Sequence, residues 1–354
     1  MNKLLLLLFA STSVLAQNTW DYPLFSFDRY EIKKSQDYYE FQSSLRKDQD
    51  VLDEFKTSGI LSYLLFEDNK IVVDENKNYH LLVNGLLPSN SMGKSLVSYV
   101  TGHAICNGDI SSTSEKLNWD ALKNTLYHNQ PLINLLNMTA GDQRHIGDYY
   151  GGEDNRLIYS NVNGNNYSLE HIMKSDLANT KKDRQVYNYS ALTTHVIFNY
   201  VLHKSGEDIL DKVFNKHVKV KNNVYFTKTN KGQGQSARYS FYADRYDYLR
   251  IAKTIMDDWN SDTCIGDYLR TIHDRRIDKG DGYKDNKRAV HSYSKSYGGQ
   301  FHFDVTGLGQ TIIGLDGFAG QNILIDVDNE KIIVINSKYA DYDWEEIVYE
   351  KYVH

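Results

Sequence analysis

The stretch Ser89-Asn90-Ser91-Met92-Gly93-Lys94-Ser95 carries the most structural and chemical information in this chain. It follows Pro88 and runs into an apolar pattern, which predicts a helix over Ser91–Ile105. Residues three apart share one helix face, so Lys94 Nζ can approach Ser91 Oγ. The helix N-terminus and the backbone N–H of Ser91 favour negative charge that develops beside the serine.

The Ser-x-x-Lys pattern alone is common, because the chain contains it three times, at Ser44–Lys47, Ser91–Lys94 and Ser292–Lys295. We expect the first copy on a charged helix face and the third in a polar loop. Only Ser91 stands at the start of an apolar helix, soon after a strand region. A serine hydroxyl needs an adjacent base, and a desolvated lysine can serve or can lower the pKa of a neighbouring tyrosine. The alternative is a solvated Ser–Lys pair at a helix start.

Strand patterns occur at both ends of the sequence, and helical patterns lie between them. We therefore predict an α+β fold, in which an antiparallel sheet shared by the two ends is flanked by helices and carries an inserted, mainly helical lobe. The expected strands are Gly59–Phe66, Lys70–Asp74, Gln310–Leu315, Asn322–Asp326 and Lys331–Asn336, and the expected helical segments are Asp37–Ser62, Ser91–Ile105, Leu132–Met138, Thr193–Lys204 and Tyr242–Trp259.

The expected organisation is a single domain over residues 17–354. Its α/β lobe takes in about 17–90 and 242–354, and its helical lobe about 91–241. No internal repeat or low-complexity linker divides the chain.

The N-terminal residues Met1–Ala16 have the features of a secretory signal peptide. Lys3 gives a short positive region, Leu4–Leu8 begin an apolar core, and Ala16 ends a small-residue cleavage site. A membrane anchor is the alternative, but the apolar stretch of about a dozen residues is shorter than the ~20 that span a bilayer. We expect a periplasmic or secreted protein without stable membrane insertion after cleavage.

The composition limits the partners and cofactors to be expected. The 354 residues include 40 Lys plus Arg and 46 Asp plus Glu, with no basic block, so no nucleic-acid partner is predicted. Two cysteines, Cys106 and Cys264, either pair as a disulfide or remain buried thiols. The twelve histidines are scattered without a metal-ligand spacing, so we predict no metal and no cofactor. The oligomeric state does not follow from the sequence.

Several segments, taken in order, resemble the serine β-lactamase/penicillin-binding-protein superfamily. They are most similar to its exported class C-like branch, which includes esterases and 6-aminohexanoate-oligomer hydrolases. The resemblance spans about Leu52–Ser337 and implies a β-lactamase-like fold. The segments are Ser89–Ser95 (family pattern S-M-x-K-S), Gly102–Ala104 with Asn107–Ile110 (a helix end and turn), Ile133–Gly141 (L-L-x-M-T-S-G), Tyr189–Ala191 (Y-S-N), Tyr242–Asp244 with Leu249–Met256, and Gly314–Gln321 (G-H-D-G-x-x-G-Q).

The resemblance implies a role for each matching residue. Ser91 would be the nucleophile that forms an acyl-enzyme, with Lys94 as its partner. Tyr189 would be the general base or proton shuttle, although Tyr187 lies only two residues away. The backbone N–H groups of Ser91 and Phe318 would form the oxyanion hole, and Asp316 and Gly317 of the same segment would contact substrate.

Two departures from the family pattern bear on the substrate. Ala191 replaces an asparagine that could bind a substrate carbonyl, and Leu315 replaces a cationic or histidine residue. Because leucine cannot pair with a substrate carboxylate, we expect an ester or amide without a required carboxylate at that point. Candidates to supply the missing charge from loops are Arg144, His145 and His302. Specificity is expected from loops at Asp142–Lys182 and Tyr225–Ser240, where Tyr149, Tyr150 and Tyr239 are candidate cleft residues.

The sequence therefore predicts an exported serine hydrolase that cleaves a small ester or amide. A penicillin-binding peptidase or β-lactamase is an alternative within the enzymes. The alternative that is not an enzyme is a catalytically weak binding or sensor module on the same fold. The residues Ala191 and Leu315 motivate it, because a protein that has lost catalytic activity is expected to depart from the family pattern in this way.

Overall fold

The computed structural model describes residues 28–77, 85–141, 169–175, 182, 185–229, 236–280 and 290–353. Its largest element within these residues is a nine-stranded sheet in the order β2-β4-β3-β13-β12-β11-β10-β9-β8. All described neighbours pair antiparallel except β2 and β4. The strands are β2 (Gln42–Ser43), β3 (Ile60–Glu67), β4 (Lys70–Asn76), β8 (Ile277–Asp278), β9 (Ser294–Gly298), β10 (Phe301–Val305), β11 (Ile312–Gly317), β12 (Gln321–Asp326) and β13 (Lys331–Ser337).

The two ends of the chain meet in this sheet, as predicted. Strand β3 pairs with β13 in a register that places Leu65 opposite Ile333. The helices begin and end as follows: α1 (Gln49–Thr57), α2 (Met92–Cys106), η4 (Asp120–Leu122), α3 (Leu132–Leu136), α5 (Leu169–Ser175), α6 (Ala191–Ser205), α7 (Asp208–Leu210), η6 (Asp211–His217), α8 (Arg245–Trp259), α9 (Cys264–Asp274), α10 (Val290–Tyr293), η8 (Glu345–Tyr349) and α11 (Glu350–Val353). The predicted α+β fold is confirmed.

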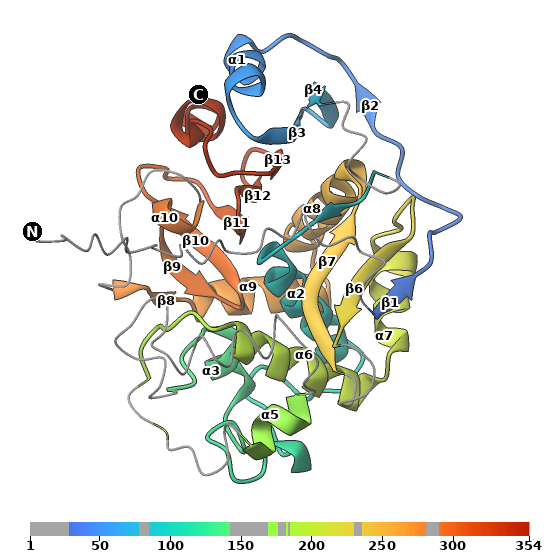
Figure 1. Cartoon of the computed structure of the whole chain (residues 1–354), viewed down its shortest axis with the longest axis vertical. Coiled ribbons are helices and arrows are strands. Elements are labelled where there is room, and N and C mark those ends of the chain that lie inside the picture. Colours follow the sequence, from blue (N-terminus) through green and yellow to red (C-terminus); the bar gives the residue numbers. More distant parts are fainter. Residues whose placement is uncertain are drawn as a thin grey trace, which may run out of the picture.

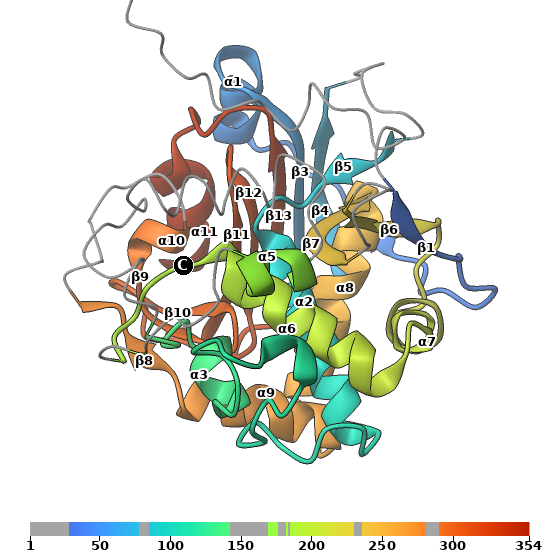
Figure 2. The same ribbon diagram turned by 60° about the horizontal axis from the view of Figure 1, so that its bottom comes forward.

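The sheet is buried on both faces, and the side-chain alternation of β3 shows why. Successive residues of a strand point to opposite faces. Leu64 and Phe66 pack into the larger core with α2, α6, α8 and α9, whereas Tyr63 and Leu65 pack into a second core with the C-terminal helices. The continuous apolar run of β3 therefore serves two cores at once. Figures 1 and 2 show α1 and the C-terminal helices on one side of the strands and α2 on the other.

A second sheet of four strands lies beside α2 and α6, in the order β1-β6-β7-β5. Its strands are β1 (Arg29–Ile32), β5 (Leu87–Pro88), β6 (Val224–Lys228) and β7 (Ala237–Ala243). The expectation of a loop over Tyr225–Ser240 is wrong, because much of this segment is β6 and β7. Phe226 and Phe241 explain the difference: their rings pack 4.7 Å apart in the core, which holds the two strands together.

The helix predicted over Asp37–Ser62 is also largely wrong, because only α1 is helical there. Before α1, Gln42 and Ser43 pair with β4, so Ser44 does not lie on a helix face. The apolar residues of this segment recur because they contact other elements, as Phe41 contacts Phe66 at 5.7 Å between ring centroids. Their mixed spacing does not come from one helix face.

Two further predictions near the C-terminal half need correction. The copy of the motif at Ser292–Lys295 is not in a loop, because it spans the end of α10 and the start of β9. Helix α8 begins at Arg245, where the Asp244 carboxylate accepts a hydrogen bond from the Asp247 backbone N–H at 2.7 Å. Tyr242 and Ala243, which were expected in that helix, end strand β7. Strands β8 and β9 are not predicted, because β8 has only two residues and β9 consists of Ser, Lys, Ser, Tyr and Gly. Strand β10 is a missed prediction, because Phe301, Phe303 and Val305 alternate with polar residues, as is typical of a strand.

The predicted signal peptide, Met1–Ala16, lies outside the described residues. Among the helices that are described, none combines the length and the apolar character needed to cross a bilayer.

A disulfide joins Cys106, the last residue of α2, to Cys264, the first residue of α9. The Cα atoms of the two cysteines are 5.7 Å apart, and 158 positions separate them in the sequence. Of the two sequence-based alternatives, pairing is therefore the one found. The bond fixes the C-terminal end of α2, whose N-terminal end carries Ser91 and Lys94.

We expect the double variant Cys106→Ser, Cys264→Ser to lose about 2–5 kcal/mol of unfolding free energy, because it removes a covalent closure of a long loop. Urea denaturation of the oxidised protein measures the loss. Reduction of the wild type should lower its stability to that of the variant, and the variant itself should not respond to the reductant. Two reactive thiols in the native, oxidised protein would contradict the pairing.

Candidate active site

Ser91 and Lys94 lie together at the N-terminal end of α2. Lys94 Nζ is 2.8 Å from Ser91 Oγ, within hydrogen-bond distance. The contact follows from the three-residue spacing on a helix, and it is the arrangement that the sequence predicts. Ser91 is partly exposed, whereas Lys94 is buried beneath it with 2% of its surface exposed.

The surroundings of Lys94 shift its pKa. Its Nζ lies 3.8 Å from the ring centroid of Tyr239 and 4.8 Å from that of Tyr189. Burial holds the pKa of Lys94 well below its usual range, because the ammonium loses its hydration, and the negative charge of Asp316 opposes this only in part. The neutral amine is thereby favoured next to the serine hydroxyl.

The turn before Ser91 is tied to the end of β11. Asn90 has a left-handed backbone (φ +48°), which asparagine tolerates better than most residues. Its Nδ2 donates a 2.7 Å hydrogen bond to the carbonyl of Phe318. A Cβ on Gly317 would lie 2.4 Å from the carbonyl oxygen of Ser89, so only glycine permits this approach of the two backbones. Ser91 and Phe318 are thus held on neighbouring backbone segments.

Helix α2 also approaches strand β7 unusually closely at Gly93. A Cβ at this position would lie 1.9 Å from the carbonyl oxygen of Tyr239. The glycine of the Ser-x-x-Lys stretch therefore lets the helix pack directly on the strand backbone. This contact places the Tyr239 ring over Lys94, a neighbour that the sequence named only as a candidate cleft residue.

Tyr189 lies two residues before the start of α6, and the hydroxyl of Ser190 between them caps that helix by accepting a hydrogen bond from the Thr193 N–H at 3.5 Å. The Tyr189 ring lies edge-on to Tyr297 at 6.2 Å between centroids, and Tyr187 lies 5.3 Å from the same ring. The structure thus brings Tyr189 next to Lys94, where the sequence expected it.

The two departures from the family pattern are both buried. Ala191 is the first residue of α6 and offers no polar group. Leu315 has none of its surface exposed and is part of the larger core. The neighbouring Phe318 side chain, by contrast, is 59% exposed at the end of the same segment. The position of Leu315 therefore provides no charge for a substrate carboxylate.

A second buried lysine, which the sequence did not indicate, lies near the same carboxylate. Lys279 Nζ donates a 2.8 Å hydrogen bond to the carbonyl of Ser294 and lies 3.0 Å from His302 Nδ1. Burial lowers the pKa of Lys279 to about 7, and Asp316 opposes the shift. Asp316 therefore acts electrostatically on both Lys94 and Lys279. Nothing in the sequence signals this cluster, because Lys279 follows β8, the other members come from β9, β10 and β11, and their spacing is not fixed.

Of the residues expected to supply a charge from loops, His302 lies instead on β10 and is buried. Arg144 and His145 lie outside the described residues, as do Tyr149 and Tyr150 and most of the expected specificity segment Asp142–Lys182.

No protein-family model and no curated protein matches this sequence. Solved structures do match the fold. A protein described as a 6-aminohexanoate-dimer hydrolase from Bacillus anthracis has a TM-score of 0.70 at 16% identity, covering 94% of this chain and 92% of its own. The chain has a β-lactamase-like fold.

Two other structures agree with this fold. A protein described as a β-lactamase from Bacteroides dorei DSM 17855 has a TM-score of 0.60 at 14% identity, covering 86% of this chain and 97% of its own. A D-stereospecific amidohydrolase from a Streptomyces species has a TM-score of 0.56 at 10% identity, covering 85% and 96%. In this β-lactamase-like fold, Ser91 lies at the start of a central helix and beside the end of β11.

The lowered pKa of Lys279 leads to a prediction about stability. Because the folded pKa of about 7 is below the ordinary 10.5, the unfolded chain binds more protons between these values, and stability should rise with pH across that interval. The free energy of unfolding of wild type minus that of Lys279→Met should therefore increase from pH 7 towards pH 10. Denaturant titrations at several pH values measure it. Lys295→Met, which removes an exposed lysine of β9, is the matched control. If the difference from wild type depends on pH in the same way for both variants, the prediction is contradicted.

Proposed function

We propose that this protein is an exported serine hydrolase that cleaves a small ester or amide through an acyl-enzyme on Ser91. The observation that carries the proposal is the 2.8 Å contact between Ser91 Oγ and the buried amine of Lys94. A solvated Ser–Lys pair would leave the amine hydrated and charged, whereas this amine is enclosed. The β-lactamase-like fold supports the same reaction class.

In the proposed reaction, Ser91 Oγ attacks the substrate carbonyl carbon, and the serine proton passes to Lys94 Nζ. The bond from that carbon to the leaving oxygen or nitrogen then breaks, and the proton passes to the leaving group by way of the Tyr189 hydroxyl. Water attacks the acyl-enzyme in the second half of the reaction. This step releases the acid and returns the proton to Ser91.

The surroundings of Lys94 favour the lysine as the base. A tyrosine base would need a cationic neighbour to lower its own pKa, but burial shifts Lys94 towards its neutral form. Once Lys94 takes the serine proton, the ring faces of Tyr239 and Tyr189 and the charge of Asp316 stabilise the resulting ammonium. Tyr189 is then suited to carry the proton onward.

The oxyanion hole is proposed at the backbone N–H groups of Ser91 and Phe318. Asn90 and Gly317 hold the two segments that carry these groups against each other. Asp316 and Gly317 are proposed to contact substrate. The buried, apolar Leu315 supports a substrate without a required carboxylate at this point. The natural partner is then a small-molecule ester or amide.

Two observations support export. The features of Met1–Ala16 are those of a signal peptide, and the Cys106–Cys264 disulfide is of the kind that persists in oxidising compartments. A periplasmic or secreted location is proposed on these grounds.

A fluorophosphonate probe should label the purified protein at Ser91, and p-nitrophenyl esters should be turned over, because both react with an activated serine. Mass spectrometry of the peptides identifies the labelled residue. Ser91→Ala should lose label and turnover. Ser44→Ala, which changes the exposed serine of another Ser-x-x-Lys copy, should behave like the wild type.

Three outcomes would contradict the proposal in different ways. Absence of both label and turnover would refute a serine hydrolase. Equal turnover by wild type and Ser91→Ala would favour a binding module. Labelling of Ser91 by a fluorescent penicillin without ester or amide turnover would favour a penicillin-binding protein.

If Lys94 is the base, Lys94→Met and Lys94→Arg should each lower kcat/KM by about 10²–10⁴-fold, because neither offers a neutral amine. The wild-type kcat/KM should rise with pH, with a midpoint below the ordinary lysine pKa of 10.5. Steady-state rates across pH test both statements. Lys47→Met should leave the profile unchanged, and substantial activity in Lys94→Arg would show instead that Lys94 acts only as a cation.

A further inference from the structure

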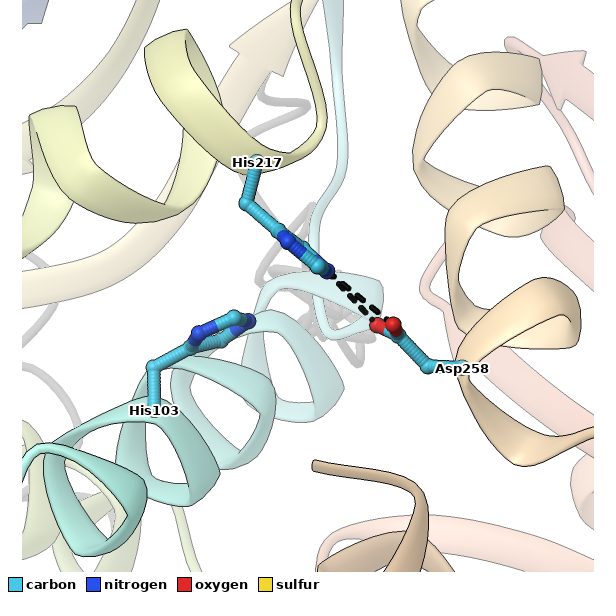
Figure 3. A group of neighbouring side chains, drawn as sticks. All are labelled: His103, His217 and Asp258. Carbon is cyan, nitrogen blue, oxygen red and sulfur yellow. Dashed lines mark hydrogen bonds and ion pairs between the residues drawn. The ribbon is translucent and has the colours of Figure 1, made fainter. Parts of the chain in front are cut away.

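Three polar side chains from three helices meet at the end of α2 that is remote from Ser91. His103 comes from the last turn of α2, His217 is the final residue of η6, and Asp258 lies near the end of α8. One nitrogen or oxygen atom from each lies within 4.8 Å of the corresponding atoms of the other two. Figure 3 shows a ring nitrogen of both histidines directed towards the Asp258 carboxylate.

The three groups form an incomplete hydrogen-bond network. His217 Nε2 is 2.9 Å from Asp258 Oδ2 and 3.1 Å from Oδ1. His103 Nε2 is buried, and no group in the described part of the chain hydrogen-bonds to it. A buried polar atom without a partner is unfavourable, so the position of this nitrogen suggests a ligand.

The state of each group suits a cation. His103 Nε2 is enclosed within the cluster, and a neutral imidazole nitrogen can offer its electron pair to a cation. The Tyr99 hydroxyl donates a hydrogen bond to Asp258 Oδ2. Such a partner orients a carboxylate ligand from outside the coordination sphere.

The backbone that carries His217 is also unusual. Element η6 is a π-helix over Asp211–His217, and π-helical turns are rare and frequently occur at functional sites. The Cys106–Cys264 disulfide fixes α2 three residues beyond His103. His217 therefore lies on a π-helix, and His103 lies close to a covalent cross-link.

We propose that His103, His217 and Asp258 bind a divalent transition metal, with zinc as the preferred ion. Two imidazoles and a carboxylate are an established zinc donor set, and water can take the fourth position because 37% of the His217 side chain is exposed. Ligand atoms at ~2.0–2.1 Å from zinc lie about 3.3 Å from one another in a tetrahedron, so small side-chain movements complete the site. The metal takes the place of the proton shared by His217 and Asp258.

The site is separate from the proposed catalytic serine. Twelve residues along α2 separate Ser91 from His103, which corresponds to about 18 Å at the rise of an α-helix. A metal there would join α2, η6 and α8. Its expected effect is on stability, and it takes no part in the acyl transfer.

The full-length purified protein, treated with a chelator and dialysed, should bind Zn²⁺ alone in a calorimetric titration with one saturable site. Thermal unfolding should then shift to a higher temperature, because the ion binds only the folded arrangement. Cobalt(II) should give the visible absorption of a tetrahedral site. His217→Ala and Asp258→Asn should each weaken zinc binding at least 10-fold, as loss of a ligand requires.

His203→Ala is the matched control, because His203 is an exposed histidine that stacks on Trp119 outside the cluster. It should bind zinc like the wild type. No saturable binding by the wild type, or equal binding by His217→Ala, would overturn the proposal and show adventitious binding only. Fluorophosphonate labelling of the same samples reports separately on Ser91, so failure of the zinc site and failure of the proposed hydrolase are distinguishable.

Discussion

The first turn of α2 carries the amine of Lys94 into the protein interior, and most of the local structure is arranged around this desolvated group. Its ammonium form loses hydration and regains only the charge of Asp316 and the ring faces of Tyr239 and Tyr189. The same loss of hydration lowers the pKa of Lys94 and so favours its neutral amine beside Ser91. The burial of Lys94 therefore opposes folding, although the proposed chemistry depends on it. The two hydrophobic cores around the central sheet must compensate for the free energy that this burial costs.

Close contacts between backbones fix where this amine lies. Gly93 lets α2 pack directly on β7, and Gly317 lets the end of β11 pack on the turn before Ser91. The side chain of Asn90 joins the same two segments. Backbone contacts of this kind leave less freedom than contacts between long side chains, which suits the proposed oxyanion hole, where two backbone donors would be held at fixed positions.

The elements that could be predicted are those whose residues follow a local pattern in the sequence. Helix α2 and strands β3, β12 and β13 follow from apolar runs, and the Ser91–Lys94 contact follows from helical spacing. Strand β9 could not be found in this way, because its Ser, Lys, Tyr and Gly residues are typical of a loop. Strand β10 has the alternation of a strand in Phe301, Phe303 and Val305, so a local pattern was available there. Lys279 sits in a sequence typical of a turn, yet it is buried. The His103 cluster combines residues from distant segments, and no spacing rule detects it.

The place of β3 in the sheet has a consequence for how the chain folds. Its contact with β4 is local, but its contact with β13 joins the two ends of the chain. During synthesis, β3 and β4 emerge early and present an apolar edge that stays open until Lys331–Ser337 arrives. Such long-range pairing slows folding and prolongs exposure of that edge. Chaperones that hold the growing chain would therefore find their longest-lived target at the strand that later pairs the two ends of the chain.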